Sequence, residues 1–198
     1  MNVRKINGSL ADFIDGETAL KAIDVVGAIA DQHGISWAIC GGIAMAVYGS
    51  PRLTKDVDII GSKRLPVQEI LGYLKQGGEH FTIETEKRVV PIDWILRNDD
   101  AKQLFEKALS EAVWIDELPV VTPEYLVTMK FIAGRFKDQE DAIYLLSQPD
   151  LVNREKVKNI IVEIFGQGAW FLAKHGYQRW FDLADGIIES SKSDLRDS

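Results

Sequence analysis

The densest chemical signal in the 198-residue sequence spans residues 40–60. It contains the diglycine Gly41-Gly42 and an Asp-x-Asp pair, Asp56 and Asp58. Glycine lets backbone N–H groups approach phosphate oxygens closely, and a helix N-terminus adds partial positive charge beside them. Two aspartates two positions apart on a strand face the same side, about 6–7 Å apart at the backbone. Their carboxylates suit a hard cation such as Mg²⁺, which takes oxygen ligands.

A third carboxylate, Asp93, lies within the apolar run 90–95, an unfavourable place for an isolated charge. If Asp93 lies beside Asp56 and Asp58, three like charges meet at roughly a few kcal/mol per close pair at intermediate dielectric. Bound divalent cations would remove that cost. Two metals about 3.5–4 Å apart would then stabilise the attacking and leaving oxygens of an in-line phosphoryl or nucleotidyl transfer. The pattern therefore predicts a site for Mg²⁺ (or Mn²⁺) and a nucleoside triphosphate (NTP).

Hydrophobic periodicity and glycine or proline stops predict the elements that position these residues. We expect helices at 17–33, 43–48, 66–75 and 100–112, and strands at 37–40, 56–60, 81–83 and 89–96. Pro91 predicts an edge or a bulge in the last strand. From residue 123 the pattern becomes almost entirely helical, at 123–136, 139–147, 153–165 and 169 to about 190.

These elements predict an α/β fold, a small mixed sheet flanked by helices and followed by an all-helical C-terminal region. The expected domains are 1–121, a catalytic unit, and 122–198, the helical region. The hydrophobic fraction of 46%, the charged fraction of 27% and the length are typical of a folded domain with an appendage.

Composition also excludes several classes of protein. No apolar run approaches the roughly 20 residues that span a bilayer, and residues 1–8 lack the hydrophobic stretch of a secretory signal. The single cysteine, Cys40, excludes an intramolecular disulfide framework and a cysteine-rich zinc site. We therefore expect no membrane partner and a cytoplasmic location. The net charge of -7 argues against strong non-specific binding to nucleic acid.

Gly41-Gly42, thirteen intervening residues, Asp56-x-Asp58 and the distal Asp93 resemble the nucleotidyltransferase superfamily of the DNA polymerase beta type. The fuller pattern, Gly41-Gly42-x-Ala44, Gly49 and Arg52-x-Thr54-x-Asp56-x-Asp58, is most similar to minimal nucleotidyltransferases and AbiEii-like toxins of type IV toxin-antitoxin systems. The resemblance extends, more weakly, to residues 122–126 with Lys130 and to the Lys/Arg-Asp-x-x-Asp segment at 135–141.

The resemblance implies a role for each matching residue. The metal ligands would be Asp56, Asp58 and Asp93, and Asp93 is also a candidate base for the acceptor hydroxyl. The triphosphate would be held by Gly41 and Gly42, with Ser50 as a further candidate. Charge neutralisation or orientation of the nucleotide would fall to Arg52, Thr54 and Lys130.

The implied reaction transfers a nucleoside monophosphate from an NTP to an acceptor and releases pyrophosphate. The acceptor could be a tRNA, a protein or a small hydroxylated molecule, and a toxin would have a cognate antitoxin as partner. Lincosamide and aminoglycoside modifiers tend to carry another residue where Thr54 stands, which disfavours them. The rival class is a non-catalytic nucleotide- or partner-binding module on the same fold.

Simpler structural roles remain open for several of these residues. Arg52 could form a surface ion pair, and Lys130 could flank a core stripe. Asp138 and Asp141 could cap the helix predicted at 139–147. The three histidines, His33, His80 and His175, show no ligand spacing, and we expect structural or exposed roles for them. For the aromatic residues Trp170, Phe171, Trp180 and Phe181 we expect helix packing rather than a base-stacking platform.

Overall fold

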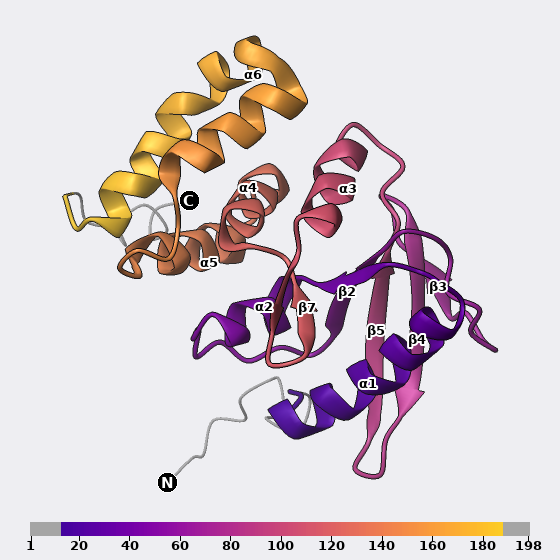
Figure 1. Cartoon of the computed structure of the whole chain (residues 1–198). Coiled ribbons are helices and arrows are strands. Elements are labelled where there is room, and N and C mark those ends of the chain that lie inside the picture. Colours follow the sequence, from indigo (N-terminus) through magenta and orange to yellow (C-terminus); the bar gives the residue numbers. More distant parts are fainter. Residues whose placement is uncertain (1–12, 188–198) are drawn as a thin grey trace, which may run out of the picture. The chain divides into compact units, whose positions relative to one another are not determined.

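The computed structural model describes residues 13–187. The chain divides into two compact units, Met1–Thr122 and Pro123–Ser198. The first combines a mixed sheet with helices and the second is helical, which confirms the predicted α/β fold with an all-helical C-terminal region (Figure 1).

The first unit is built on a seven-stranded sheet with the order β3-β4-β5-β2-β1-β7-β6. Its strands are β1 (Trp37–Ile39), β2 (Val57–Gly61), β3 (Gly72–Tyr73), β4 (Gly78–Glu84), β5 (Val89–Ile95), β6 (Val113–Ile115) and β7 (Leu118–Val120). The central strand β2 pairs parallel with β5 and antiparallel with β1. β4 pairs antiparallel with β5, so the sheet is mixed.

The helices α1 (Gly16–Gln32) and α3 (Lys102–Ser110) lie on opposite faces of this sheet. A Cβ at Gly27 of α1 would lie 2.6 Å from the Trp37 ring, so α1 covers the face that carries Trp37. The next residue, Ala38, points to the other face and is in register with Ile60, which is in register with Ile95. Ile60 and Ile95 line a hollow together with side chains of α3. α3 therefore covers the face opposite α1.

Pro91 lies in an interior strand, so the predicted edge position is wrong. β5 has β4 on one side and β2 on the other. The register with β2 begins only at Ile92, which pairs with Val57, while Pro91 is opposite Thr82 of β4. The missing N–H of proline therefore falls before the parallel ladder begins.

The helix predicted at 66–75 is also wrong, since this segment ends in the short strand β3 and pairs with β4. Leu71 N donates to His80 O at 2.8 Å, and Leu74 N donates to Gly78 O at 3.0 Å. Ile70 and Leu71 are exposed, so a helix here would bury no apolar face. A helix this short is marginal without such burial, and pairing with β4 satisfies its backbone instead.

The second unit contains α4 (Pro123–Ala133), α5 (Phe136–Ser147) and α6 (Arg154–Ala184). The two helices predicted at 153–165 and from 169 are one element with a kink at Gly166, whose φ of 85° is a left-handed value that favours glycine. The predicted end near 190 lies outside the described residues. Within residues 13–187 no helix combines the length and apolar character that crossing a membrane requires.

Aromatic residues form the core of the second unit. The ring of Phe131 in α4 stacks on Tyr177 of α6 with centroids 3.7 Å apart, and Trp180 meets the Phe131 ring edge-on at 4.9 Å. Packing is thus confirmed for Trp180 and Phe181, which are buried, whereas Phe171 is 66% exposed and does not join the core.

Removing the cap of α6 should destabilise the second unit. The Asn153 side chain accepts a hydrogen bond from Lys156 N at 3.0 Å. We expect Asn153→Ala to lower the unfolding free energy by about 1 kcal/mol, measured by urea denaturation, because a helix N–H loses its partner. Asn159→Ala, an exposed mid-helix change on α6, is the control and should be neutral or slightly stabilising. Equal losses in both variants would contradict a capping role.

Candidate active site

The pairing of β2 with β5 sets Asp58 opposite Asp93. The two residues are register partners on adjacent parallel strands, so both point to the same face of the sheet. This is the face that carries Ile60 and Ile95, two residues further along each strand. Both aspartates are only partly buried. The structure thus brings together two of the three predicted carboxylates.

The start of α2 (Gly41–Val47) lies directly beside Asp58. Cys40 N donates to Asp58 O at 2.9 Å, which fixes the turn next to β2. Gly41 has a φ of 57°, and a Cβ there would lie 1.8 Å from Oδ2 of Asp58. The position therefore requires glycine twice, for its backbone angle and for the space that the Asp58 carboxylate occupies.

Thr54 connects the second glycine to Asp56. Its Oγ1 atom lies 3.1 Å from Oδ1 of Asp56 and 3.1 Å from the Asp56 carbonyl oxygen, so the hydroxyl donates to this residue. A Cβ at Gly42 would lie 2.5 Å from the same Oγ1. Thr54 is buried, and it orients Asp56 at the entrance to β2.

Ser50 and Arg52 lie in the loop between α2 and β2. Ser50 N donates to Met45 O at 2.9 Å, and Ser50 Oγ accepts from Arg52 N at 3.4 Å. Within this loop both residues contribute to the turn that leads to Thr54. Their predicted contacts with a nucleotide stay predictions.

Carboxylate oxygens are the donors that Mg²⁺ and Mn²⁺ prefer, so the donor set fits such an ion. Among residues 13–187, however, no three His, Cys, Asp or Glu side chains are grouped closely enough to hold a metal. Two aspartates are paired by register, and the third is oriented by Thr54 just before the strand. The metal site of Asp56, Asp58 and Asp93 thus remains a prediction.

His80 is a neighbour of the site that the sequence analysis missed. Its Nδ1 atom lies 2.6 Å from Oδ1 of Asp93, and the two residues are opposite each other in β4 and β5. With Asp93 ionised, Nδ1–H donates to the carboxylate. The β4–β5 hairpin is the sequence signal that could have revealed this contact. Once the hairpin loop is placed at residues 85–88, counting away from the loop along both strands pairs His80 with Asp93.

Lys130 belongs to the second unit, where it is the centre of a buried ionic cluster. Its Nζ donates to Asp141 Oδ2 at 2.7 Å and to Asp138 Oδ1 at 3.3 Å. All three residues are buried. The Lys/Arg-Asp-x-x-Asp segment of α5 thus pairs with the lysine of α4. A contact between Lys130 and a nucleotide stays a prediction.

Arg135 adds a second cation to this cluster. Its Nε donates to Asp138 Oδ2 at 2.6 Å, and its backbone N–H donates to the same atom at 3.3 Å. Burial by itself would raise the pKa of Asp138. The hydrogen bonds from Arg135 and the charge of Lys130 outweigh burial, so the pKa lies below its ordinary value.

Comparison with known proteins finds similarity only at the level of solved structures. No family model and no curated protein matches the chain. Among solved structures, the chain is similar to the antibiotic-resistance factor ANT(2'')-Ia, described in solution as having substrate-regulated conformation dynamics. The identity is 15%, the match covers 88% of this chain and 98% of that one, and the TM-score is 0.37. A TM-score this low supports no conclusion about the activity of this chain.

Removing the amine at the centre of the ionic cluster should strongly destabilise the protein. Lys130→Ala leaves two buried aspartates without the charge that they share, and losing one partner of a buried pair costs about 3–5 kcal/mol. The measurement is the unfolding free energy by urea denaturation. Lys158, whose ion pair with Glu155 lies on the surface, provides the control, and Lys158→Ala should cost less than about 1 kcal/mol. Similar losses for both variants would show that the cluster is not structural.

Proposed function

We propose that the predicted catalytic unit, residues 1–121, is a metal-dependent nucleotidyltransferase that transfers a nucleoside monophosphate from an NTP to a hydroxyl acceptor. The observation that carries this proposal is the β2–β5 register, which sets Asp58 opposite Asp93 next to the glycine turn at Gly41. This arrangement places two carboxylates close to the backbone of a glycine turn.

The glycine turn supplies backbone N–H groups for the phosphates in this proposal. At Gly41 and Gly42 any Cβ would collide with Asp58 or Thr54, so only glycine lets the turn pack this closely against the two residues. Backbone N–H groups in such a turn can approach phosphate oxygens closely. Ser50 and Arg52 are the further proposed contacts of the triphosphate.

Asp56, Asp58 and Asp93 would hold Mg²⁺ or Mn²⁺. When bound, such ions neutralise phosphate charge and stabilise the attacking and leaving oxygens of an in-line displacement. In the proposed reaction the Asp93 carboxylate accepts the proton of the acceptor hydroxyl. His80 keeps that carboxylate oriented through the 2.6 Å contact, which makes it a positioning residue.

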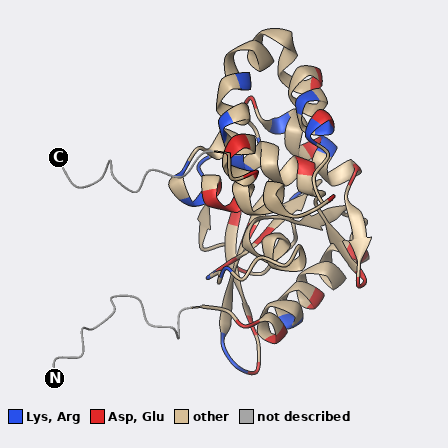
Figure 2. Cartoon of the chain, turned by 90° about the vertical axis from the view of Figure 1, so that its left-hand side faces the viewer, with Lys and Arg blue, Asp and Glu red and all other residues tan. Residues whose placement is uncertain are grey.

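A small molecule or a protein is favoured over a large RNA as the acceptor. The net charge is -7, and in Figure 2 basic and acidic segments alternate along the helices rather than separating into a basic stripe. Phosphate-backbone binding depends on clustered Lys and Arg. A cytoplasmic toxin with a cognate antitoxin is the finer proposal, and it rests on the resemblance to AbiEii-like toxins.

A non-catalytic nucleotide-binding module is the second candidate. It is favoured by the absence of a three-donor group among the described residues and by the engagement of Asp93 with His80. The two candidates differ in one observable, the transfer of label from an NTP.

Label transfer tests the proposal directly. The protein is incubated with each α-labelled NTP, Mg²⁺ or Mn²⁺ and cell extract, and compared with Asp56→Asn/Asp58→Asn. We expect transfer to fall by about three orders of magnitude in the double variant, because metal ligands supply several kcal/mol of transition-state stabilisation. Asp24→Asn, an exposed change on α1, is the control. Failure of the wild type to bind NTP or metal in calorimetry would refute the proposal.

Substituting the first glycine should abolish transfer while leaving a folded protein. Gly41→Ala places a Cβ against Asp58 Oδ2 and strains the backbone by about 1–3 kcal/mol. Gly34 has a similar φ of 60° with open space around it, so Gly34→Ala carries the same backbone strain without the collision. We expect both variants to lose stability in urea denaturation, Gly41→Ala by at least as much as Gly34→Ala, but label transfer to be lost only in Gly41→Ala. Equal transfer by the two variants would contradict the role of the turn.

A further inference from the structure

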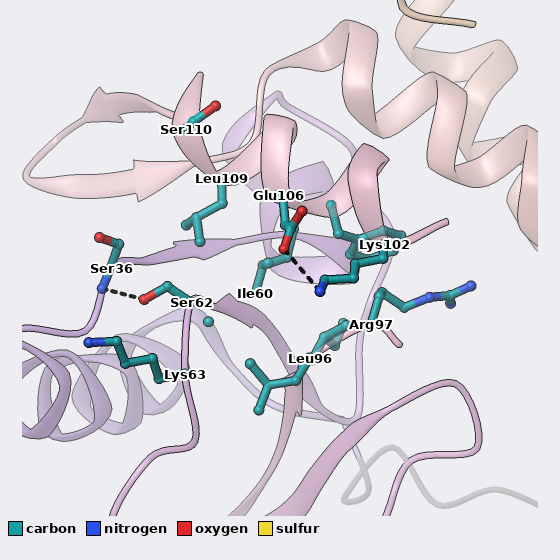
Figure 3. Close-up of a pocket in the computed structure, with 13 residues that line it drawn as sticks. Ser36, Ile60, Ser62, Lys63, Leu96, Arg97, Lys102, Glu106, Leu109 and Ser110 are labelled. Carbon is teal, nitrogen blue, oxygen red and sulfur yellow. Dashed lines mark hydrogen bonds and ion pairs between the residues drawn. The ribbon is translucent and has the colours of Figure 1, made fainter. Parts of the chain in front are cut away.

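The first unit contains a hollow of about 610 Å³ between α3 and the sheet (Figure 3). Its floor is formed by the ends of β2 and β5, and its cover by one side of α3. A volume of this size is in the range of small-molecule sites, about 300–1,000 Å³, and is too small for a folded macromolecule.

The hollow lies on the same sheet face as the proposed catalytic carboxylates. Ile60 and Ile95 line it, and they follow Asp58 and Asp93 by two positions on the paired strands. Residues two apart on a strand share a face and are separated by about 6–7 Å. A molecule seated in the hollow would therefore lie within one small-molecule length of both aspartates.

The lining combines an apolar floor with a basic rim. Ile60, Leu96 and Leu109 surround the centre of the hollow in Figure 3, where Lys102 and Glu106 face each other. The Lys102 Nζ atom lies 3.6 Å from Oε1 of Glu106. Since this pair is neutral, it contributes no net charge to the hollow.

The remaining cations of the lining are Lys63 and Arg97. Arg97 is neutralised by Asp99, with contacts of 2.9 and 2.6 Å, and it lies over the Phe105 ring. Lys63 has no ion-pair partner within residues 13–187, and its carbonyl oxygen accepts from Trp94 Nε1 at 2.8 Å, which anchors its backbone. The net charge at the rim is therefore positive and is carried by Lys63, an exposed side chain that extends outward from the hollow in Figure 3.

We infer that this hollow binds the acceptor, and that the acceptor is a small hydroxylated molecule with an apolar body and an anionic group. The inference rests on the proposed function. The acceptor oxygen attacks the α-phosphorus, the bond from that phosphorus to the pyrophosphate oxygen breaks, and the hydroxyl proton passes to Asp93. Lys63 attracts the anionic group, and the same charge repels a polycationic acceptor.

The test uses 8-anilinonaphthalene-1-sulfonate, an apolar anion whose fluorescence rises on binding, and auramine O, a cationic dye of similar size. We expect the wild type to bind the anion more tightly than the cation. Lys63→Glu should lower the affinity for the anionic dye by about three- to ten-fold, as expected for reversal of one rim charge. Leu109→Trp, which fills the hollow, should reduce binding of both dyes.

Lys75→Glu is the matched control, because Lys75 is exposed and does not line the hollow. Circular dichroism of each variant verifies folding. Unchanged anion binding in Lys63→Glu and Leu109→Trp would overturn the inference, as would tighter binding of auramine O.

A second measurement links the hollow to the acceptor. The anionic dye should inhibit label transfer while leaving the affinity for Mg²⁺–ATP, measured by calorimetry, unchanged. Displacement of the nucleotide by the dye would refute the acceptor assignment. If label transfer occurs but neither variant changes dye binding, the inference about the hollow is wrong and the proposed function is unaffected. If the dyes bind as expected but no NTP supports transfer, the proposed function is wrong and the ligand class inferred for the hollow still holds.

Discussion

The parallel register of β2 with β5 is the constraint on which the first unit depends. It fixes Asp58 against Asp93, and through alternation it places Ile60 and Ile95 on the same face. A shift of one residue in either strand would turn its carboxylate to the α1 face, and with it Ile60 in β2 or Ile95 in β5. One set of backbone hydrogen bonds therefore positions the proposed catalytic groups, the floor of the hollow and the core at the same time.

In the second unit the main constraint is the burial of charged side chains. Lys130 enters an apolar helix and is compensated by two aspartates one turn apart on α5, and Arg135 completes the set. A buried charge is tolerated only when paired and hydrogen-bonded. The residues of the Lys/Arg-Asp-x-x-Asp segment therefore have a structural role within their own unit, in addition to any role toward a nucleotide.

Local sequence signals predicted elements well where burial and periodicity agreed. The helix ending before Gly34, the strand 37–39 and the turn at Gly41 match the pattern of apolar residues and glycines. The helix prediction for residues 66–75 was wrong because proline and apolar spacing indicate a helix whether or not there is a surface against which it can be buried. There the pairing with β4 decided the outcome, and pairing is a property of distant residues.

The sequence by itself determined the fold class, the helical character after residue 122 and the glycine turn that precedes the Asp-x-Asp strand. These follow from periodicity, capping and backbone angles, which are local. Only the tertiary structure decided that Asp93 faces Asp58, that His80 holds Asp93, that Lys130 is paired with Asp138 and Asp141, and that α3 closes a hollow over Ile60 and Ile95. Each of these depends on strand register or on packing between separate elements, and the residue pattern within one element does not fix either.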